Sequence, residues 1–136
     1  LPFFNHCLHK QTLGPRAREL VILRTGWLAG SSYEWSQHVP IALRRDVKPA
    51  EINAIPDGPF HEEWNGLDGA LLEAVDGLMT NFTMKDTEWK RVACNLMPSA
   101  ILDLIFTVVQ YRLVAGLLCG FNVQLDSHLS FPPAVD

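Results

Sequence analysis

The spacing of apolar residues along the chain is that of α-helices rather than β-strands. Leu20, Leu23 and Trp27 follow one another at intervals of three and four, which places them on one helix face. No stretch shows convincing two-residue alternation, and no Asn-Gly or Asp-Gly turn links two apolar strands. The pattern predicts an all-α domain.

Pro, Gly and Ser residues mark the expected helix ends. A helix should begin at Pro15, where the missing N–H costs nothing, and end near Ala29 before Gly30. Its apolar face is expected to comprise Leu20, Leu23, Trp27 and Leu28. Further helices are expected over residues 31–45, 49–55 and 86–96, and from Asn65 and Pro98 onward, with a turn at 56–59.

The helix that begins at Pro98 is the most apolar part of the chain. Ile101, Ile105, Val108, Val109 and Leu113 predict that it is buried nearly all round. Asp103, Gln110 and Arg112 interrupt the run, which fits a membrane span poorly, so no membrane partner is expected. We expect the tail from Phe121 to be extended.

Composition places the chain among globular intracellular proteins. It has 136 residues, 48% apolar residues and a net charge of −4, which disfavours nucleic acid as a partner. Three widely spaced cysteines form no metal motif and no disulfide framework, so we expect reduced cysteines, with Cys94 and Cys119 in the core, and a cytoplasmic location.

We divide the chain into three parts. Residues 1–12 form an N-terminal segment, residues 13–126 form the helical domain, and residues 127–136 form a tail. Because the chain opens on Leu1 rather than Met, one interpretation is that residues 1–12 are the remainder of a truncated N-terminal segment.

The stretch "GSSYEWSQH", residues 30–38, has two interpretations. Ser31 and Glu34 have the S-x-x-E spacing of a capping box, which stabilises a helix start by about 1 kcal/mol and needs no function. Glu34 and His38 are four residues apart, so the carboxylate could orient the imidazole for acid–base chemistry. If Gly30 reverses the chain, Glu19 of the preceding helix can also approach His38.

The segment "PRARELVILRTGWLAGSSYEWSQHVPIALR" resembles the core motif of the carboxymuconolactone decarboxylase family, which includes the alkyl hydroperoxidase D proteins. "LDGALLEAVDGL", "FTMKDTEW" and "DLIFTVVQYRLVAGLLCGFNVQLD" resemble the rest of that domain, so the likeness covers roughly residues 13–126. The resemblance implies an alkyl hydroperoxidase D-like fold and a homo-oligomer, since relatives form dimers, trimers and hexamers. It implies no metal and no organic cofactor.

The family pattern falls on Glu19, Ser31, Glu34 and His38 of this chain. Relatives in the peroxidase branch have cysteines at the second position and often at the third, where this chain has Ser and Glu. The thiols are therefore missing, while the acid–base residues His38, Glu34 and Glu19 are kept. Ser31 should line an anion or oxyanion site at the helix start.

Other polar and aromatic residues are candidates for contacts with a substrate. Tyr33 could orient a substrate through its hydroxyl group, whereas Trp35 is expected in the pocket wall or the core. One of Gln110, Tyr111 and Arg112 could face the pocket. Arg112 could bind a carboxylate with both nitrogens, and an ion pair at a subunit interface is an equally good explanation.

Three functions are compatible with these residues. The first is a cofactor-free lyase or isomerase that acts on a small carbonyl, lactone or polyketide-like metabolite through the Glu/Glu/His site. The second is a peroxidase-like antioxidant protein, which the missing cysteines disfavour. The third is a non-catalytic oligomer that binds a ligand.

Overall fold

The computed structural model describes residues 2–125, apart from the side chains at positions 3, 4, 7 and 8. Its elements are helices joined by short loops, and the described residues form no strand. They are α1 (Pro2–His9), α2 (Pro15–Leu28), α3 (Ser32–Arg44), α4 (Pro49–Ala54), the 3₁₀ helix η1 (Ile55–Asp57), α5 (Gly66–Asn81), α6 (Asp86–Ala93) and α7 (Pro98–Gly120). The predicted all-α class is confirmed.

Most helices begin where Pro or a capping side chain predicts. Pro15, Pro49 and Pro98 are the first residues of their helices, and the Asn65 side chain accepts a hydrogen bond from the Asp68 N–H at 2.8 Å. The prediction for α6 was too long at its C-terminal end, because the helix ends at Ala93 rather than near Leu96. α1 was not predicted at all.

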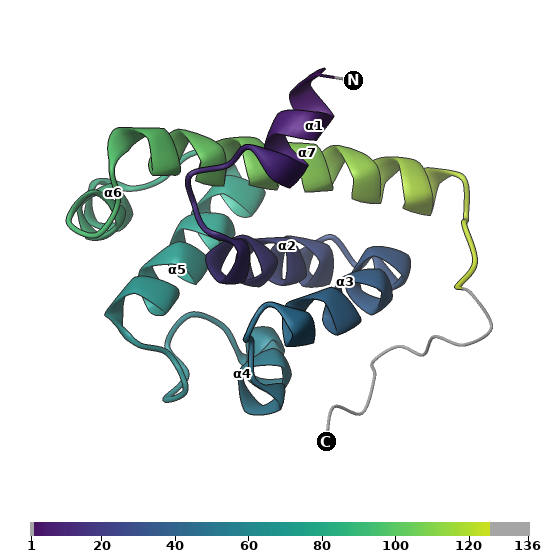
Figure 1. The fold of residues 1–136 in the computed structure, drawn as a ribbon, viewed down its shortest axis with the longest axis horizontal. Helices are drawn as coiled ribbons and strands as arrows, with labels where there is room; N and C mark the ends of the chain where they lie inside the picture. The colour runs from purple at the N-terminus through teal and green to yellow at the C-terminus, as the bar shows by residue number, and fades with distance from the viewer. Residues whose placement is uncertain (1, 126–136) are drawn as a thin grey trace.

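Helix α2 is the centre of the molecule and packs against α3, α5 and α7 (Figure 1). Every residue from Glu19 to Gly26 is buried, including the charged ones. Of the predicted apolar face, Leu20 and Leu23 are fully buried, but Leu28 is 40% exposed at the helix end. A helix buried on all sides must find partners for its polar side chains within the protein.

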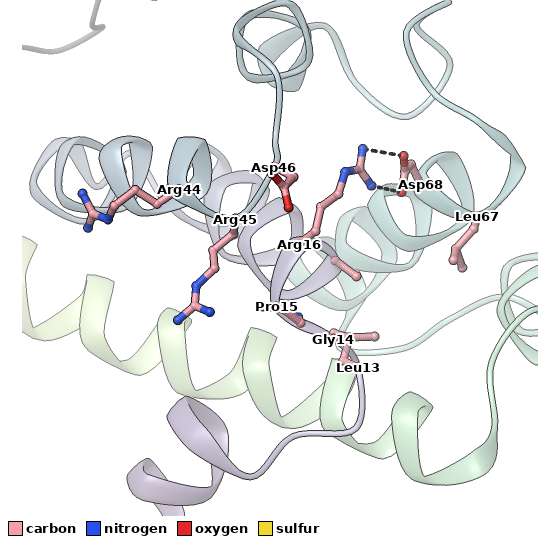
Figure 2. Close-up of a pocket in the computed structure, with 10 residues that line it drawn as sticks. Leu13, Gly14, Pro15, Arg16, Arg44, Arg45, Asp46, Leu67 and Asp68 are labelled. Carbon is pink, nitrogen blue, oxygen red and sulfur yellow. Dashed lines mark hydrogen bonds and ion pairs between the residues drawn. The ribbon is translucent and has the colours of Figure 1, made fainter.

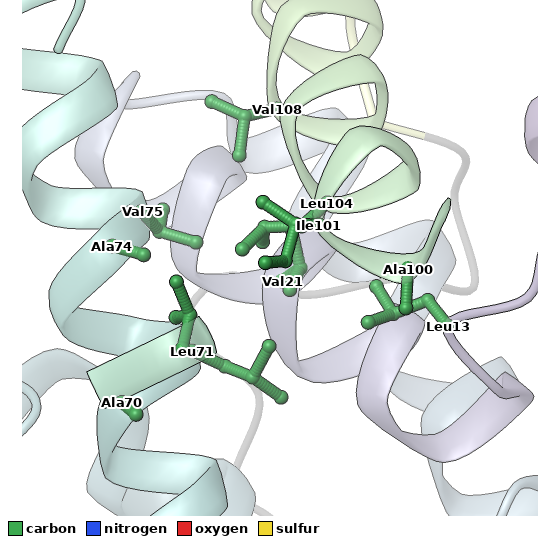
Figure 3. Packing of buried hydrophobic residues seen from close by; sticks show 11 residues of the cluster. Leu13, Val21, Ala70, Leu71, Ala74, Val75, Ala100, Ile101, Leu104 and Val108 are labelled. Atoms are coloured by element: carbon green, nitrogen blue, oxygen red, sulfur yellow. The ribbon is translucent and has the colours of Figure 1, made fainter. Parts of the chain in front are cut away.

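Two clusters of apolar side chains fill the spaces around α2. One joins α2, α5 and α7 through Val21, Leu71, Val75 and Leu104 (Figure 3). The other joins α2 to α3 and the α4–η1 segment through residues that include Leu23, Trp35, Val39 and Ile52. The first cluster holds α2 against α5 and α7, and the second fixes the position of α3 relative to α2.

Arg24 links α2 to α5 and to the 3₁₀ helix η1. Its guanidinium contacts both carboxylate oxygens of Asp76, at 2.7 and 3.0 Å, and donates to the Ile55 carbonyl at 2.7 Å. The side chain is only 8% exposed. Because a buried guanidinium is costly unless its donors are paired, these bonds stabilise one arrangement of the three segments.

The N-terminal segment is fastened to α7 by polar contacts. His6 Nε2 lies 2.7 Å from one oxygen of Asp103, and the other oxygen accepts from the Thr12 backbone and hydroxyl. Burial alone would raise the pKa of Asp103, but the hydrogen bonds from Thr12 and His6 outweigh it and lower that pKa. Gln11 extends the contact by donating to Thr107 at 2.6 Å.

Two predictions about burial are wrong for the single chain. Helix α7 buries one side only, since Val109 and Leu113 remain 54% and 51% exposed. Cys94 and Cys119 are exposed rather than in the core, because they lie at the solvent-facing ends of their helices. By length and composition α7 could span a membrane, with a mean hydropathy of 1.7, but its buried side packs on α2 and α5 as a core helix does.

Candidate active site

The turn between α2 and α3 places the candidate residues side by side. Gly30 has a φ of 67°, a conformation that costs glycine little, and it follows the last residues of α2. The Ser31 N–H then donates back to the Gly26 carbonyl at 3.0 Å, which turns the chain into α3. The face of α3 that carries Ser31, Glu34 and His38 therefore lies along α2.

Half of the predicted capping box is present. The Ser31 hydroxyl oxygen accepts from the Glu34 N–H at 3.4 Å, as an N-cap does. The second bond of a capping box, from the Ser31 N–H to the Glu34 carboxyl group, is missing. The Ser31 N–H donates to the Gly26 carbonyl instead, and neither Glu34 carboxyl oxygen has a hydrogen-bond partner among the described residues. Capping therefore explains Ser31 but does not explain Glu34.

Glu19 and His38 form a hydrogen-bonded pair, the dyad, between α2 and α3. The Glu19 Oε2 atom lies 2.8 Å from His38 Nδ1, and the two side chains are 1% and 14% exposed. The other oxygen, Oε1, lies 3.5 Å from a guanidinium nitrogen of Arg18. The carboxylate thus bridges a cation on one side and the imidazole on the other.

The contacts of His38 leave its second ring nitrogen available. Tyr111 of α7 packs against the imidazole in an edge-on arrangement, with ring centroids 5.0 Å apart and an interplanar angle of 88°. No described residue makes a hydrogen bond to Nε2. A carboxylate that accepts from Nδ1–H leaves the lone pair of neutral imidazole on Nε2, the atom that would take a proton from a substrate.

Glu34 is buried without a hydrogen-bond partner among the described residues. The residue is 2% exposed, and neither carboxyl oxygen has a partner. Burial raises the pKa of Glu34 from 4.5 to about 8. The close approach to α2 depends on Gly26, since a Cβ there would lie 3.3 Å from Glu34 Oε1. At neutral pH Glu34 is therefore mostly a neutral carboxylic acid.

The structure distributes the predicted substrate-contacting residues over different places. Ser31 and Tyr33 line a hollow of about 210 Å³ together with Cys119 of α7. Trp35 packs against Trp27 with ring centroids 5.4 Å apart, which makes it part of the α2–α3 packing. Arg112 donates to the Met79 carbonyl at 3.1 Å and lies over the Phe82 ring at 4.0 Å. Arg112 is thus engaged with the end of α5 and makes no described contact with the dyad.

Two residues near the dyad had weak or no sequence signal. In the sequence, Tyr111 stands out only as a polar interruption of an apolar helix. Arg18 carries one weak signal, its position next to a glutamate on a helix predicted to be buried. Within residues 2–125, no group of three or more His, Cys, Asp or Glu side chains could hold a metal ion.

Comparison with known proteins supports the family seen in the sequence. Residues 2–58 match the model of the carboxymuconolactone decarboxylase family. The match includes residues 2–12 of the N-terminal segment, and it contains Glu19, Ser31, Glu34 and His38. The family resemblance is thereby confirmed over these residues. No curated protein matches the chain.

Solved structures share this fold at low sequence identity. One is a protein of unknown function from Agrobacterium tumefaciens, suggested to be the antioxidant defence protein AhpD, with 16% identity and a TM-score of 0.85 over 92% of this chain and 86% of that one. Another is the debrominase Bmp8, solved both alone and with 2,3,4-tribromopyrrole, with 13% identity and a TM-score of 0.80 over 93% of this chain and 68% of that one. The alkyl hydroperoxidase D-like fold is confirmed.

The raised pKa of Glu34 predicts how stability depends on pH. The folded state keeps a proton that the unfolded state releases, so this contribution is fully present below about pH 4.5 and is lost as the pH rises to about 8. We expect Glu34→Gln to remove this loss of stability at higher pH. The difference in free energy of unfolding between Glu34→Gln and the unchanged chain should therefore increase, in favour of the variant, by up to about 1.4 kcal/mol per pH unit over this range.

Urea unfolding between about pH 5 and about pH 8 measures this difference. Glu62→Gln is the matched control because Glu62 is exposed in a loop. The same pH dependence in both variants would contradict a buried, protonated Glu34.

Proposed function

We propose that this carboxymuconolactone decarboxylase family chain is a cofactor-free acid–base enzyme, a lyase or isomerase. Its substrate would be a small carbonyl, lactone or polyketide-like metabolite. In an isomerisation, His38 Nε2 removes a proton from one substrate carbon and Glu34 adds a proton at another. In a decarboxylation, the loss of CO2 forms the enolate, and Glu34 gives it the proton. Glu19 holds the imidazole in place without touching the substrate. Decarboxylation and proton-shift isomerisation both pass through an enolate, so one such site suits either reaction.

The hydrogen bond between Glu19 and His38 carries this proposal. At 2.8 Å from Nδ1, the buried carboxylate orients the ring and stabilises the imidazolium that forms when Nε2 takes a proton. Arg18 stands on the far side of the same carboxylate. A helix cap between Ser31 and Glu34 would require neither the Glu19–His38 hydrogen bond nor the contact between Glu19 and Arg18.

Glu34 supplies the complementary acid. A carboxylic acid whose pKa lies at about 8 is protonated at neutral pH and can still release its proton readily. Glu34 and His38 lie one helical turn apart on α3, so one small molecule could contact both. The carboxyl oxygens are closed off from solvent, so a substrate reaches them only after neighbouring side chains move.

A peroxidase-like function is the second candidate, and one observation favours it. Cys119 is a free thiol that lines the same hollow as Ser31. Against it, positions 31 and 34 hold Ser and Glu, so the paired thiols that carry out redox chemistry in relatives are not at those positions. A ligand-binding oligomer without catalysis is the third candidate.

Substitution of the three site residues tests the proposed function. We expect His38→Ala to lower turnover by about 10² to 10⁴, the usual contribution of general acid–base catalysis. Glu34→Gln should also lower it steeply because an amide cannot give up the proton, and Glu19→Gln should do so because the support for the imidazolium is lost. The measurement is turnover of candidate lactones and β-keto acids, with thermal unfolding recorded for each variant.

Peroxide reduction in the presence of a dithiol gives the contrasting measurement. The unchanged chain should not consume hydroperoxide, and Cys119→Ser should behave like it. Peroxide turnover that disappears in Cys119→Ser would favour the peroxidase function instead. If His38→Ala, Glu34→Gln and Glu19→Gln all stay folded and keep full lyase or isomerase activity, these three residues are not the active site.

We also propose that the chain works as a homo-oligomer held together by α7. The exposed side of this helix carries an apolar stripe made of Leu102, Val109, Leu113 and Leu117, each about half exposed. Their intervals of seven, four and four residues place them on one helix face, as in a helix that packs against another helix. A two-fold axis at Val109 would set Leu102 of one copy against Gly116 of the other, where no atom lies within 4 Å of an added Cβ.

Light scattering measures this assembly. We expect a mass of at least twice the 15.3 kDa chain, and Val109→Asp should give a monomer because it puts a charge at the centre of the stripe. Phe60→Asp is the control, since Phe60 is exposed on a loop away from α7. A clean monomer for the unchanged chain at micromolar concentration contradicts the proposal.

A further inference from the structure

An apolar hollow lies between α6 and the first turns of α7, and the proposed active site does not use it. It has a volume of about 450 Å³, and all of its lining residues are apolar. The lining includes Trp89 and Ala93 of α6 and Pro98, Ile101, Leu102 and Ile105 of α7. A cavity of about 150 Å³ can hold a benzene ring, so this hollow has room for a large apolar side chain.

Contacts on the far side of its walls hold the hollow open. Val92 of α6 is fully buried in the cluster of apolar side chains between α2, α5 and α7, and Arg91 is paired with Glu73 of α5. Ile101 of α7 belongs to the same cluster (Figure 3). The hollow is therefore already formed in the single chain, which lowers the cost of filling it.

A hollow beside the first turn of α2 has a different character. Its volume of about 390 Å³ is similar, but its lining includes Arg16, Arg45 and Asp68. Figure 2 shows Arg16 facing Asp68, and both of its terminal nitrogens donate to that carboxylate at 3.0 Å. An apolar occupant there would remove charged groups from water without replacing their hydrogen bonds. An apolar side chain therefore fits the α6–α7 hollow better.

Phe121 offers such a side chain at the opposite end of α7. It is 80% exposed, and its N–H donates to the Leu117 carbonyl at 3.0 Å, so it extends the last turn of the helix. Figure 1 shows α6 beside the start of α7, far from the end that leads to Phe121. About 30 Å of helix separates Phe121 from Ile101 at 1.5 Å per residue, so Phe121 cannot fill the hollow of its own chain.

A single ridge of side chains on α7 connects the hollow to Phe121. The members of the ridge follow one another at intervals of four and are Ile101, Ile105, Val109, Leu113, Leu117 and Phe121. The first two line the hollow, and the last four are each more than half exposed. Ridges with this spacing interdigitate when two helices cross at about −50°. In an antiparallel pair, the Phe121 end of one ridge meets the Ile101 end of the other.

We propose that the hollow of one copy of the chain receives the Phe121 side chain of a second copy. The inference rests on the homo-oligomer proposed above, whose two-fold axis at Val109 sets Leu117 of one copy opposite Ile101 of the other. Side chains on a helix lean toward its N-terminal end, so the Phe121 ring lies near the level of Leu117. The ring therefore reaches the hollow, and the two-fold axis repeats the contact in the other copy.

The area that the interface needs also favours this occupant. The stripe of Leu102, Val109, Leu113 and Leu117 offers at most about 100 Å² for each side chain, or about 800 Å² for two copies. Stable interfaces bury about 1,200 to 2,000 Å². A buried Phe contributes about 150 to 250 Å², and the walls around it lose a similar area. Two Phe121 contacts thus raise the total from the size of a crystal contact to that of a stable interface.

Sedimentation equilibrium of the full chain gives the dissociation constant of the dimer. We expect Phe121→Ala to raise this constant by about 100-fold or more, because it removes two buried aromatic contacts at once. Phe60→Ala is the matched control, since Phe60 is 78% exposed away from α7. The control should change the constant by less than about threefold. An equal effect of the two substitutions would overturn the proposal.

A second variant tests the receiving side of the contact. Ala93 is exposed at the wall of the hollow, so Ala93→Trp fills the hollow without disturbing the core. We expect it to weaken the dimer by about tenfold or more, and the addition of Phe121→Ala should weaken it little further, because both changes remove the same contact. Fully additive losses would overturn the pairing. A loss in Ala93→Trp alone would assign the hollow to another part of the second copy.

The direction of the two helices is measured by pulsed electron resonance. A spin label on Cys119, in a chain with Cys7→Ser and Cys94→Ser, lies ten residues from Val109. The antiparallel arrangement predicts about 30 Å between the two labels of a dimer, at 1.5 Å per residue on each side of the axis. A separation below about 15 Å would indicate parallel helices, which cannot bring Phe121 to the hollow.

The variants separate this inference from the proposals on which it rests. If Val109→Asp gives a monomer while Phe121→Ala dimerises like the unchanged chain, the assembly through α7 stands and the Phe121 contact fails. If the unchanged chain is a monomer, both fail. His38→Ala removes the proposed base and leaves α7 unchanged, so it should dimerise like the unchanged chain, even if the acid–base function fails.

Discussion

Burial of Glu19 inside the central helix is the constraint on which the site depends. A carboxylate that is 1% exposed is costly unless it is paired, and its partners come from two directions. Arg18 lies on its own helix, and His38 comes from α3. The pairing requires α2 and α3 to lie side by side, which the Gly30 turn and the apolar contacts around Leu23 and Trp35 achieve. One hydrogen bond thus links the fold to the proposed chemistry.

Local sequence signals predicted the elements well where a single residue decides the backbone. Pro15, Pro49 and Pro98 fixed three helix starts, and Gly30 fixed the turn that brings α3 back along α2. The approach of Glu19 to His38 also followed from sequence. A buried charge in an apolar helix needs a partner, and the turn leaves few choices.

Tertiary packing decided what sequence patterns could not. The Ser31/Glu34 spacing predicted a reciprocal cap, but the Gly26 carbonyl takes the Ser31 N–H and leaves the Glu34 carboxyl buried. The apolar character of α7 predicted burial all round, and only the side facing α2 and α5 is covered within one chain. Arg112 binds the end of α5 because Met79 and Phe82 lie there, which no local pattern in the sequence reveals.

Nitrogen NMR of the His38 ring tests the central claim most directly. We predict that neutral His38 carries its proton on Nδ1, bonded to Glu19, and leaves Nε2 unprotonated. Glu19→Gln should abolish this preference while the chain stays folded. A ring that is protonated on Nε2 in the unchanged chain, or a tautomer that does not respond to Glu19→Gln, would contradict the account.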